Sequence, residues 1–275
     1  MRILFIGDIV GKPGRDLVRR GVGGLVEHHQ IDLVVANAEN AAAGSGITRE
    51  LGDQILGSGV DVMTSGNHIW AKREAIDYIG TEPRLLRPAN FAAGVPGNGS
   101  YVARSADGRT AGVINVMGRV FMAPLDDPFA VVTREIDALR ARAKVILVDF
   151  HAEATSEKVA MGWYLDGKVT AVVGTHTHVQ TADERILPKG TAYLTDVGMT
   201  GPHDSVIGVE IEPALSRFLN GMPSRFETAT ANPRLNAVVI DADERTGRAT
   251  DIERLSYSLE ELEDLAPVAP SSGTA

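Results

Sequence analysis

The chain contains the stretch Val169-Thr170-Ala171-Val172-Val173-Gly174-Thr175-His176-Thr177-His178. It joins a predicted strand to residues that can bind a metal or take part in catalysis. Its apolar, β-branched first half predicts a short buried strand. Open α/β folds bind their ligands at the carboxyl ends of such strands. If the segment stays extended, the side chains of His176 and His178 point to the same side. Taken alone, the pair fits a metal site and two hydrogen-bonded loop histidines equally well, although neutral imidazole is a common metal ligand.

Polar residues also follow four other short apolar runs. Each could be explained singly by a turn, a helix cap or a buried hydrogen bond. Together they place five sets of possible ligands at five strand ends, and four of the seven histidines fall among them. This coincidence favours a metal site. The four further sets are Gly7-Asp8, Glu39-Asn40, Gly66-Asn67-His68 and Asp149-Phe150-His151.

Runs with helical periodicity alternate with the apolar runs over most of the chain, which is typical of a parallel or mixed α/β sheet. Two runs joined by residues 105–109 predict a hairpin, so a mixed sheet is expected. We therefore expect an α/β fold with two sheets packed face to face and helices outside. The expected helices are 15–29, 48–56 with Thr48 as N-cap, 72–79, 127–143 and 156–165. The last third is expected to contain strands at 193–195, 206–211, 237–240 and 251–257.

The length of 275 residues and the hydrophobic content of 44% suffice for one large core. We expect a single domain over residues 1–258. Residues 259–275 begin with an acidic run, which is typical of a solvated helix face or end. From Ala266 onward this tail is rich in Pro, Ser and Gly and has little to bury, so partial disorder is expected there.

Composition also excludes several classes of protein. Without cysteine, the chain has no disulfide, thiolate metal site or iron–sulfur cluster, which suits a reducing cytoplasm. The first apolar run is too short for a signal peptide, and no other stretch approaches transmembrane length. The formal net charge of -9 argues against a basic face that binds duplex nucleic acid. We expect a cytoplasmic protein with a small-molecule substrate and no membrane association. Homo-oligomers are compatible with the sequence, but no heptad pattern defines them.

The possible ligands include carboxylate, amide and imidazole groups, and they are too many for one tetrahedral ion. Two ions that share a bridging carboxylate fit the set better. Two ions about 3.5–4 Å apart can hold a hydroxide and bind the oxygens of a phosphoryl group during in-line displacement. Imidazole mixed with oxygen ligands suits Fe, Mn or Zn better than Mg or Ca. The chemistry favoured is metal-dependent hydrolysis of a phosphate ester.

The order of these motifs resembles that of the calcineurin-like metallophosphoesterases, from Gly7-Asp8 to the final His-x-His pair. The opening from Gly7 to Arg15, the motif Ala38-Glu39-Asn40 and the stretch from Thr175 to Gly208 look like the YmdB-like bacterial branch. This resemblance covers residue 1 to about residue 257. It implies a metallophosphoesterase-type α/β/β/α sandwich of two mixed β-sheets flanked by helices. The sequence departs from the wider superfamily in two places, because Val10 replaces a histidine and Glu39 replaces a bridging aspartate.

The resemblance also implies a role for each site residue. Asp8, Glu39, Asn40 and His178 would bind one ion. Glu39, Asn67, His151 and His176 would bind the other, with Glu39 as the bridge. Asn40 would help to compensate for the histidine absent at Val10. His68 is implied as the general acid that protonates the leaving alkoxide, which suits an imidazole because it titrates near neutral pH. The family suggests iron, with manganese able to replace it in vitro.

The activity implied is a phosphodiesterase for cyclic nucleotides, particularly 2',3'-cyclic nucleoside monophosphates, with a metal-bridging hydroxide as nucleophile. Two other classes fit parts of the sequence. A metal-dependent amidohydrolase also uses a His-x-His pair, but on the first strand of an eight-fold barrel. A non-catalytic regulatory protein could keep the metal site, but it would have no use for a proton donor at His68. In addition, His203 could border the substrate pocket, and Arg119 could pair with a phosphate, although surface arginines are commoner.

Overall fold

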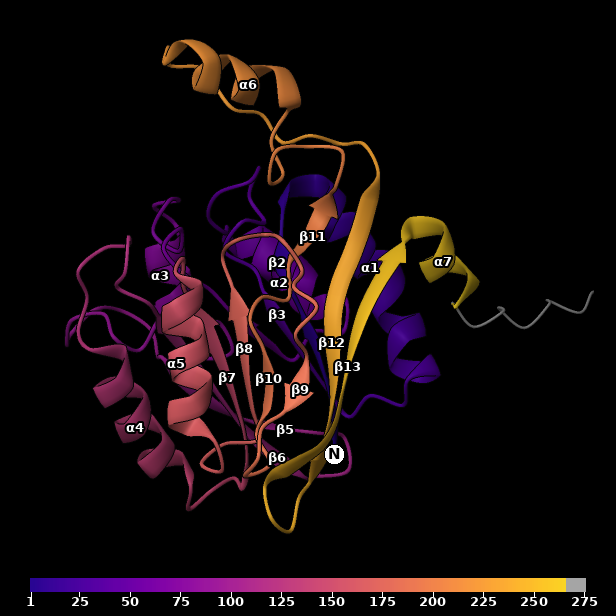
Figure 1. The fold of residues 1–275 in the computed structure, drawn as a ribbon. Helices are drawn as coiled ribbons and strands as arrows, with labels where there is room; N and C mark the ends of the chain where they lie inside the picture. Colours follow the sequence, from indigo (N-terminus) through magenta and orange to yellow (C-terminus); the bar gives the residue numbers. More distant parts are fainter. Residues whose placement is uncertain (266–275) are drawn as a thin grey trace, which may run out of the picture.

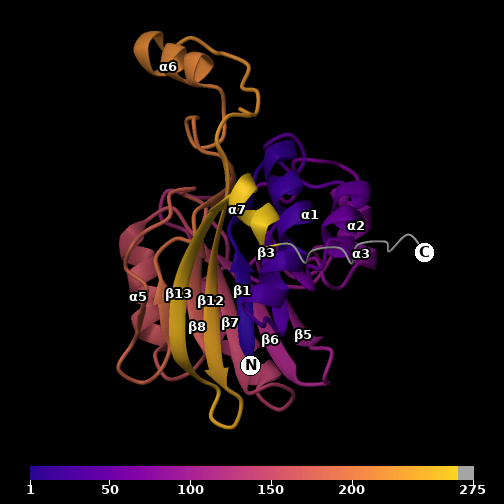
Figure 2. The same ribbon diagram turned by 90° about the vertical axis from the view of Figure 1, so that its right-hand side faces the viewer.

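The structure is a computed structural model that describes residues 1–265. Two β-sheets face each other, and helices cover the outer face of each (Figure 1). A view at a right angle places α5 outside one sheet and α1 and α2 outside the other (Figure 2). The predicted sandwich of two mixed sheets is therefore confirmed. Residues 266–275, the Pro/Ser/Gly-rich part of the predicted tail, lie outside the described residues.

The first sheet has seven strands within residues 1–265. They are β1 (Arg2–Ile6), β2 (Asp8–Ile9), β3 (Leu33–Asn37), β4 (Val62–Thr64), β11 (Met199–Pro202), β12 (Pro233–Asp243) and β13 (Arg248–Ser258). Their order is β2-β11-β12-β1-β3-β4, with β13 paired to β12. The sheet is mixed, because β1 runs parallel to β3 and antiparallel to β12.

The second sheet has six strands in the same part of the chain. They are β5 (Ser100–Arg104), β6 (Thr110–Met117), β7 (Val145–His151), β8 (Ala171–Thr175), β9 (Arg185–Ile186) and β10 (Ala192–Leu194). Their order is β5-β6-β7-β8-β10-β9. The strands from β6 to β10 along this order are parallel, and β5 pairs with β6 as the predicted antiparallel hairpin.

Alternation along the strands divides the core into layers, because successive side chains of a strand point to opposite faces. In β1, Ile3 and Phe5 are buried between the two sheets, whereas Leu4 and Ile6 are buried with residues of the outer helices. A third apolar cluster lies beneath α4 and α5. The helices are α1 (Gly11–His28), α2 (Arg49–Gly57), α3 (Ala75–Thr81), α4 (Pro128–Leu139), α5 (Thr155–Leu165), α6 (Ile211–Asn220) and α7 (Leu259–Asp264).

The helices differ from the expected ones mainly at their ends. Helix α1 begins at Gly11, four residues before the expected start at Arg15. The predicted cap of α2 is confirmed, because the Thr48 hydroxyl accepts a hydrogen bond from the Leu51 amide at 3.3 Å. The acidic run forms the short helix α7, whose Leu262 is buried against Gly21 of α1. The domain boundary at residue 258 stays a prediction.

The strand expected at residues 206–211 is wrong. This β-branched stretch forms turns with isolated bridges, and it leads into α6, which projects away from the sandwich (Figure 1). The chain cannot stay extended there, because Ile207 and Gly208 have φ angles of 48° and 103°. The apolar residues Ile211, Leu215 and Phe218 follow a helical spacing that the strand prediction overlooked.

Among the described residues, no helix is both long enough and apolar enough to cross a membrane.

Candidate metal centre

The predicted site residues gather at one end of the sandwich. β1 and β3 are parallel in the first sheet, and β7 and β8 are parallel in the second. Residues at or just beyond their carboxyl ends therefore meet across the two sheets. Contacts connect all eight predicted side chains, which are Asp8, Glu39, Asn40, Asn67, His68, His151, His176 and His178.

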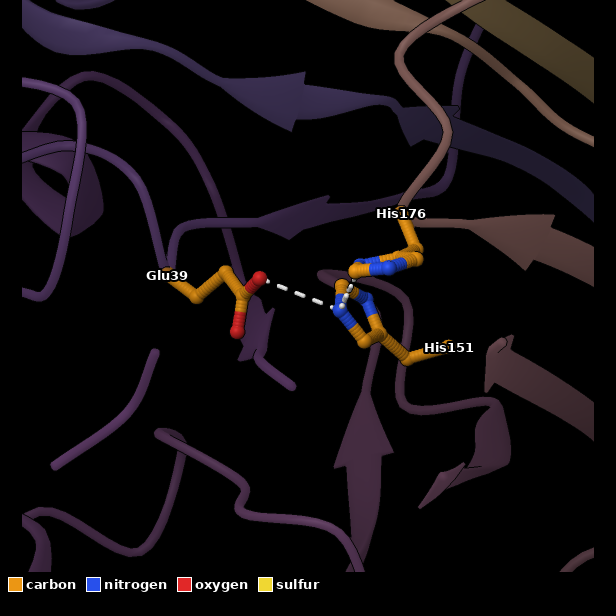
Figure 3. Close-up of side chains that lie close together, drawn as sticks. All are labelled: Glu39, His151 and His176. Atoms are coloured by element: carbon orange, nitrogen blue, oxygen red, sulfur yellow. Dashed lines mark hydrogen bonds and ion pairs between the residues drawn. The ribbon is translucent and has the colours of Figure 1, made fainter. Parts of the chain in front are cut away.

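Three possible ligand atoms converge on a fourth, Nε2 of His151. Its Nε2 lies 3.1 Å from Glu39 Oε1, 2.9 Å from Asn67 Oδ1 and 3.0 Å from His176 Nδ1. One ligand atom from each of Glu39, His151 and His176 lies within 4.8 Å of the other two (Figure 3). The turn that carries Asn67 requires glycine, since a Cβ at Gly66 would lie 2.1 Å from His151 Cδ2. This group of four residues is called the His151 set below.

A chain of hydrogen bonds orients the His151 ring. The Thr175 hydroxyl donates to Asp149 Oδ1 at 2.7 Å and accepts from His151 Nδ1 at 2.9 Å. Because Nδ1 carries the proton, Nε2 of the neutral ring presents a lone pair to Glu39, Asn67 and His176. Three further atoms with lone pairs lie 2.9–3.1 Å from this nitrogen, and such atoms repel it unless a cation stands among them. The set is thus arranged to hold a positive charge.

The pKa values of these groups also indicate that the site favours a positive charge. Burial lowers the pKa of His151, but the nearby Glu39 carboxylate outweighs burial and raises it to about 9. Burial raises the pKa of Glu39, but the charge on His151 outweighs burial and lowers it to about 2. Burial, with the His151 charge, lowers the pKa of His176 to about 3, so this ring is neutral and can act as a ligand.

Two carboxylate oxygens at the site accept no hydrogen bond from the described residues. They are Asp8 Oδ1 and Glu39 Oε1, and both side chains are buried. A buried acceptor without a partner costs free energy, and a buried charge costs more unless it is paired or binds a metal. The donor set therefore fits divalent metal ions.

The possible ligand atoms around His178 lie farther apart than those of the His151 set. Nε2 of His178 lies 3.8 Å from Asp8 Oδ1 and 3.2 Å from Asn40 Nδ2. The Nδ1–H group donates to the Ile207 carbonyl at 2.8 Å, so Nε2 accepts the proton of the Asn40 amide. For His178 to bind a metal, the Asn40 side chain must turn and release this lone pair.

His68 lies between the two sets and solvent. Its Nδ1 donates to Asn40 Oδ1 at 2.7 Å and lies 3.7 Å from Glu39 Oε1. The His68 backbone amide also donates to Glu39 Oε2 at 2.8 Å. The ring remains 42% exposed, so its Nε2 can reach a bound molecule or water.

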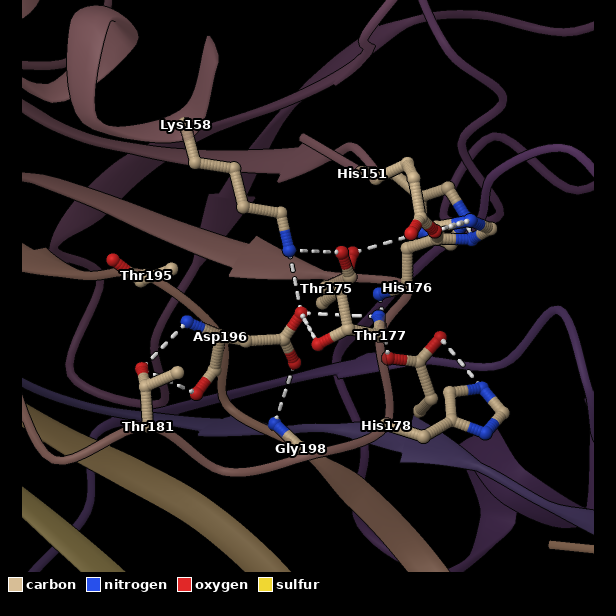
Figure 4. A network of polar contacts seen from close by, with 12 residues as sticks. His151, Lys158, Thr175, His176, Thr177, His178, Thr181, Thr195, Asp196 and Gly198 are labelled. Atoms are coloured by element: carbon tan, nitrogen blue, oxygen red, sulfur yellow. Dashed lines mark hydrogen bonds and ion pairs between the residues drawn. The ribbon is translucent and has the colours of Figure 1, made fainter. Parts of the chain in front are cut away.

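The expectation that His176 and His178 extend the strand is wrong. β8 ends at Thr175, and the φ angles of the two histidines are 103° and 66°, in the left-handed region that costs free energy for such residues. Asp196 causes the bend, because its Oδ2 accepts hydrogen bonds from the Thr177 amide at 3.1 Å and the Thr177 hydroxyl at 2.8 Å (Figure 4). As a result, His176 points to the His151 set and His178 to Asn40.

Sequence reasoning missed several supporting residues. Glu153 Oε2 lies 3.1 Å from His176 Nε2, and no sequence signal marked it. Asp196 follows the short strand β10, so the strand-end rule used for the other sites could have found it. Buried Lys158 completes this support by donating to Asp196 Oδ2 and to the Thr175 carbonyl.

His203 and Arg119 have different surroundings. His203 lines a cavity of about 580 Å³ that also borders His178. That His203 borders the substrate stays a prediction. Arg119 pairs with Asp127 at 3.3 Å, and both side chains are exposed, which matches the surface role.

Two mixed sheets flanked by helices, with a carboxylate and two imidazoles converging at strand ends, define a protein of the metallophosphoesterase type. A sequence model of the family described as YmdB-like protein matches residues 4–255. The chain belongs to this family.

Curated relatives support this assignment over nearly the full chain. A Bacillus subtilis protein named 2',3'-cyclic-nucleotide 2'-phosphodiesterase is 52% identical over 256 residues, which cover 93% of this chain and 96% of the relative. A putative phosphatase/phosphodiesterase of Mycoplasma genitalium is 34% identical over 97% of this chain and 96% of its own.

Solved structures show the same fold. A hypothetical protein from Thermus thermophilus has a TM-score of 0.88 and 42% identity, covering 94% of this chain and 99% of its own. A phosphatase from Mycoplasma pneumoniae has a TM-score of 0.88 and 35% identity, covering 94% of this chain and 93% of its own.

Proposed function

We propose that this protein is a dinuclear metal-dependent phosphodiesterase that hydrolyses 2',3'-cyclic nucleotides. The observation that carries the proposal is a pair of buried carboxylate oxygens, Asp8 Oδ1 and Glu39 Oε1, beside the converging His151 set. Neither accepts a hydrogen bond from the described residues. The name of the Bacillus subtilis relative supports both the reaction and the substrate class.

The contacts described above support the proposed ligand assignment. Glu39, Asn67, His151 and His176 would hold one ion. Asp8, Asn40 and His178 would hold the other, with Glu39 between them as the bridge. When bound, the two ions would supply a bridging hydroxide as nucleophile and neutralise charge on the phosphorus oxygens. Imidazole and oxygen ligands together favour Fe, with Mn or Zn as alternatives.

His68 would act as the general acid. Hydrolysis of the 2' bond releases the ribose O2' as an alkoxide, a poor leaving group unless it receives a proton. The Nδ1–H group of His68 is held by Asn40, so its exposed Nε2 is the nitrogen that can deliver a proton to O2'. The Asn40 amide thereby links the orientation of the acid to the His178 side of the site.

The structure excludes one of the two alternative classes, the amidohydrolase, but not the non-catalytic regulator. The amidohydrolase hypothesis is wrong, because the histidine pair follows β8 of a two-sheet sandwich rather than the first strand of a barrel. A non-catalytic metal-binding regulator would share every ligand described above, and only turnover separates it from an enzyme.

The test is a substrate panel on the full chain loaded with Mn or Fe. We expect hydrolysis of 2',3'-cyclic nucleotides to 3'-nucleotides, and slower turnover of 3',5'-cyclic nucleotides and of phosphomonoesters. Metal content is measured in the same samples by elemental analysis. Two bound ions per chain without turnover of any phosphodiester would contradict the proposal and favour the regulator.

A further inference from the structure

The cavity beside His178 lies next to the place proposed for the phosphodiester. Its walls come from the loop after β8, from β11 and the turn that follows it, and from β12 and β13. Its volume of about 580 Å³ exceeds that of a single aromatic ring system. Apolar and polar side chains both line it, among them Met199, Val206, Ile207, His203, Arg234 and Asn236.

One residue that lines the cavity, Asn236, has a buried polar atom without a hydrogen-bond partner among the described residues. Asn236 is 3% exposed, and its Oδ1 accepts no hydrogen bond from the described residues. Its Nδ2 lies 3.1 Å from His203 Nε2, and His203 Nδ1 lies 3.0 Å from the Gly201 carbonyl. Because a carbonyl only accepts, Nδ1 carries a proton, and in this tautomer Nε2 accepts from the Asn236 amide. The orientation of Asn236 is thereby fixed, with its oxygen unused.

A buried unused acceptor is satisfied by a ligand that brings an N–H group. The apolar side chains around it suit the faces of a flat heteroaromatic ring. The ring of His178 forms part of the cavity wall and also contacts Asn40 in the candidate metal centre. A molecule whose phosphodiester lies at the metal centre therefore places its adjoining ring in or near this cavity.

We propose that this cavity binds the base of the cyclic nucleotide, and that Asn236 Oδ1 selects bases with an exocyclic amino group. The inference rests on the proposed function. Cytosine and adenine can donate their amino protons to this oxygen, whereas uracil presents a carbonyl where cytosine has the amino group. Two acceptors would then face each other at a buried position.

The experiment compares four substrates of the full chain loaded with Mn. They are 2',3'-cyclic CMP, AMP and UMP, and the base-free methyl riboside 2',3'-cyclic phosphate. We expect kcat/KM to be about tenfold higher for cyclic CMP than for cyclic UMP, the usual size of one discriminating hydrogen bond. Asn236→Ala should bring this ratio close to one without changing turnover of the base-free substrate.

A second variant keeps the test decisive if Asn236→Ala folds poorly. Ser256 is exposed, lines the cavity and pairs with Asn236 across β12 and β13. Ser256→Trp should fill the cavity and raise KM about tenfold for all three nucleotides while sparing the base-free substrate. The matched control is Phe121→Ala, since Phe121 is 90% exposed and follows β6, on the other side of β7 from β8.

The outcomes separate the two proposals. An unchanged KM in Ser256→Trp, or equal turnover of all four substrates by the parent, overturns the base cavity alone. The base cavity is also overturned if Phe121→Ala loses the base preference while Asn236→Ala and Ser256→Trp keep it. The base would then lie near Phe121 and not near Asn236. If the metal-loaded parent hydrolyses none of the four, the proposed function fails and the base cavity fails with it.

Discussion

The ammonium group of Lys158 lies 2.5 Å from Asp196 Oδ2, and both side chains are buried. Lys158 also donates to the Thr175 carbonyl, and Asp196 also accepts from Thr177 and from the Gly198 amide (Figure 4). The pair therefore ties α5 and the segment after β10 to the bend that carries His176 and His178. A buried ion pair at this position holds two predicted ligands in a strained backbone.

Replacing Lys158 by Met should destabilise the protein by about 3–5 kcal/mol, because the Asp196 carboxylate stays buried without its partner. Urea unfolding of the metal-free protein measures the change. Arg254→Met is the control, since Arg254 pairs with Glu184 at 3.2 Å near the surface. Loss of an exposed pair of this kind costs less than about 1 kcal/mol. Equal losses in the two variants would contradict the importance of the buried pair.

Glu39→Gln should abolish binding of at least one ion together with activity. The carboxylate oxygens of Glu39 face His151 and His68, and an amide supplies only one weaker oxygen ligand. Elemental analysis of the purified variant checks this. Glu157→Gln is the control, because the Glu157 carboxylate is also largely buried but, among the described residues, accepts only the backbone amides of Arg119 and Val120. Full metal occupancy in Glu39→Gln would refute the bridging role.

His68→Ala should lower kcat for 2',3'-cyclic nucleotides by about 10²–10⁴-fold and keep both ions. The loss should be much smaller for bis(p-nitrophenyl) phosphate, because p-nitrophenolate leaves without protonation. Steady-state kinetics on the two substrates measure the contrast, with the exposed His28→Ala as control. A metal-free variant, or equal losses on both substrates, would show that His68 is not the acid.

Glu153→Gln should weaken metal binding by about 10–100-fold, the usual effect of losing a carboxylate that orients a ligating histidine. Glu153 lies 3.1 Å from His176 Nε2, on the side of the ring opposite to the nitrogen that faces His151. Competition with a chelator of known affinity gives the metal Kd. Exposed Glu50→Gln should bind metal like the parent, and the same result for Glu153→Gln would exclude the orienting role.

The stability contributed by Asp183 should depend on pH. Burial raises the pKa of this carboxyl, but hydrogen bonds from Thr181 and Thr195 outweigh burial and lower it below its usual value. A lowered folded pKa stabilises the protein above the unfolded pKa of about 3.9, and this contribution disappears as pH falls through the folded pKa. Asp183→Asn should therefore be less stable than the parent at pH 7, with a difference that shrinks below about pH 4.

Urea unfolding of the metal-free proteins at several pH values measures this difference. Exposed Asp137→Asn on α4 is the control and should match the parent throughout. A destabilisation of Asp183→Asn that is as large in acid as at neutral pH would contradict the role of the charged carboxylate.

Much of the site was predictable because its signals are local. Short β-branched runs with polar residues just after them marked Asp8, Glu39, Asn67, His151 and His176, and the structure brings all five together. The β-branched residues at 206–211 misled the strand prediction, because left-handed φ angles such as those of Ile207 and Gly208 depend on contacts that a local pattern does not contain.

The sequence by itself determined the layers of the sandwich and the chemical types at its strand ends, because alternation and strand termini depend on near neighbours along the chain. Only the tertiary structure decided that the backbone bends at His176 and His178, that Glu153 supports His176, and that Asn236, which lines a cavity, has an oxygen that accepts no hydrogen bond from the described residues. These features depend on contacts between segments far apart in the chain, such as Lys158 with Asp196 and Asn236 with His203. Their distances become defined only when the two sheets pack.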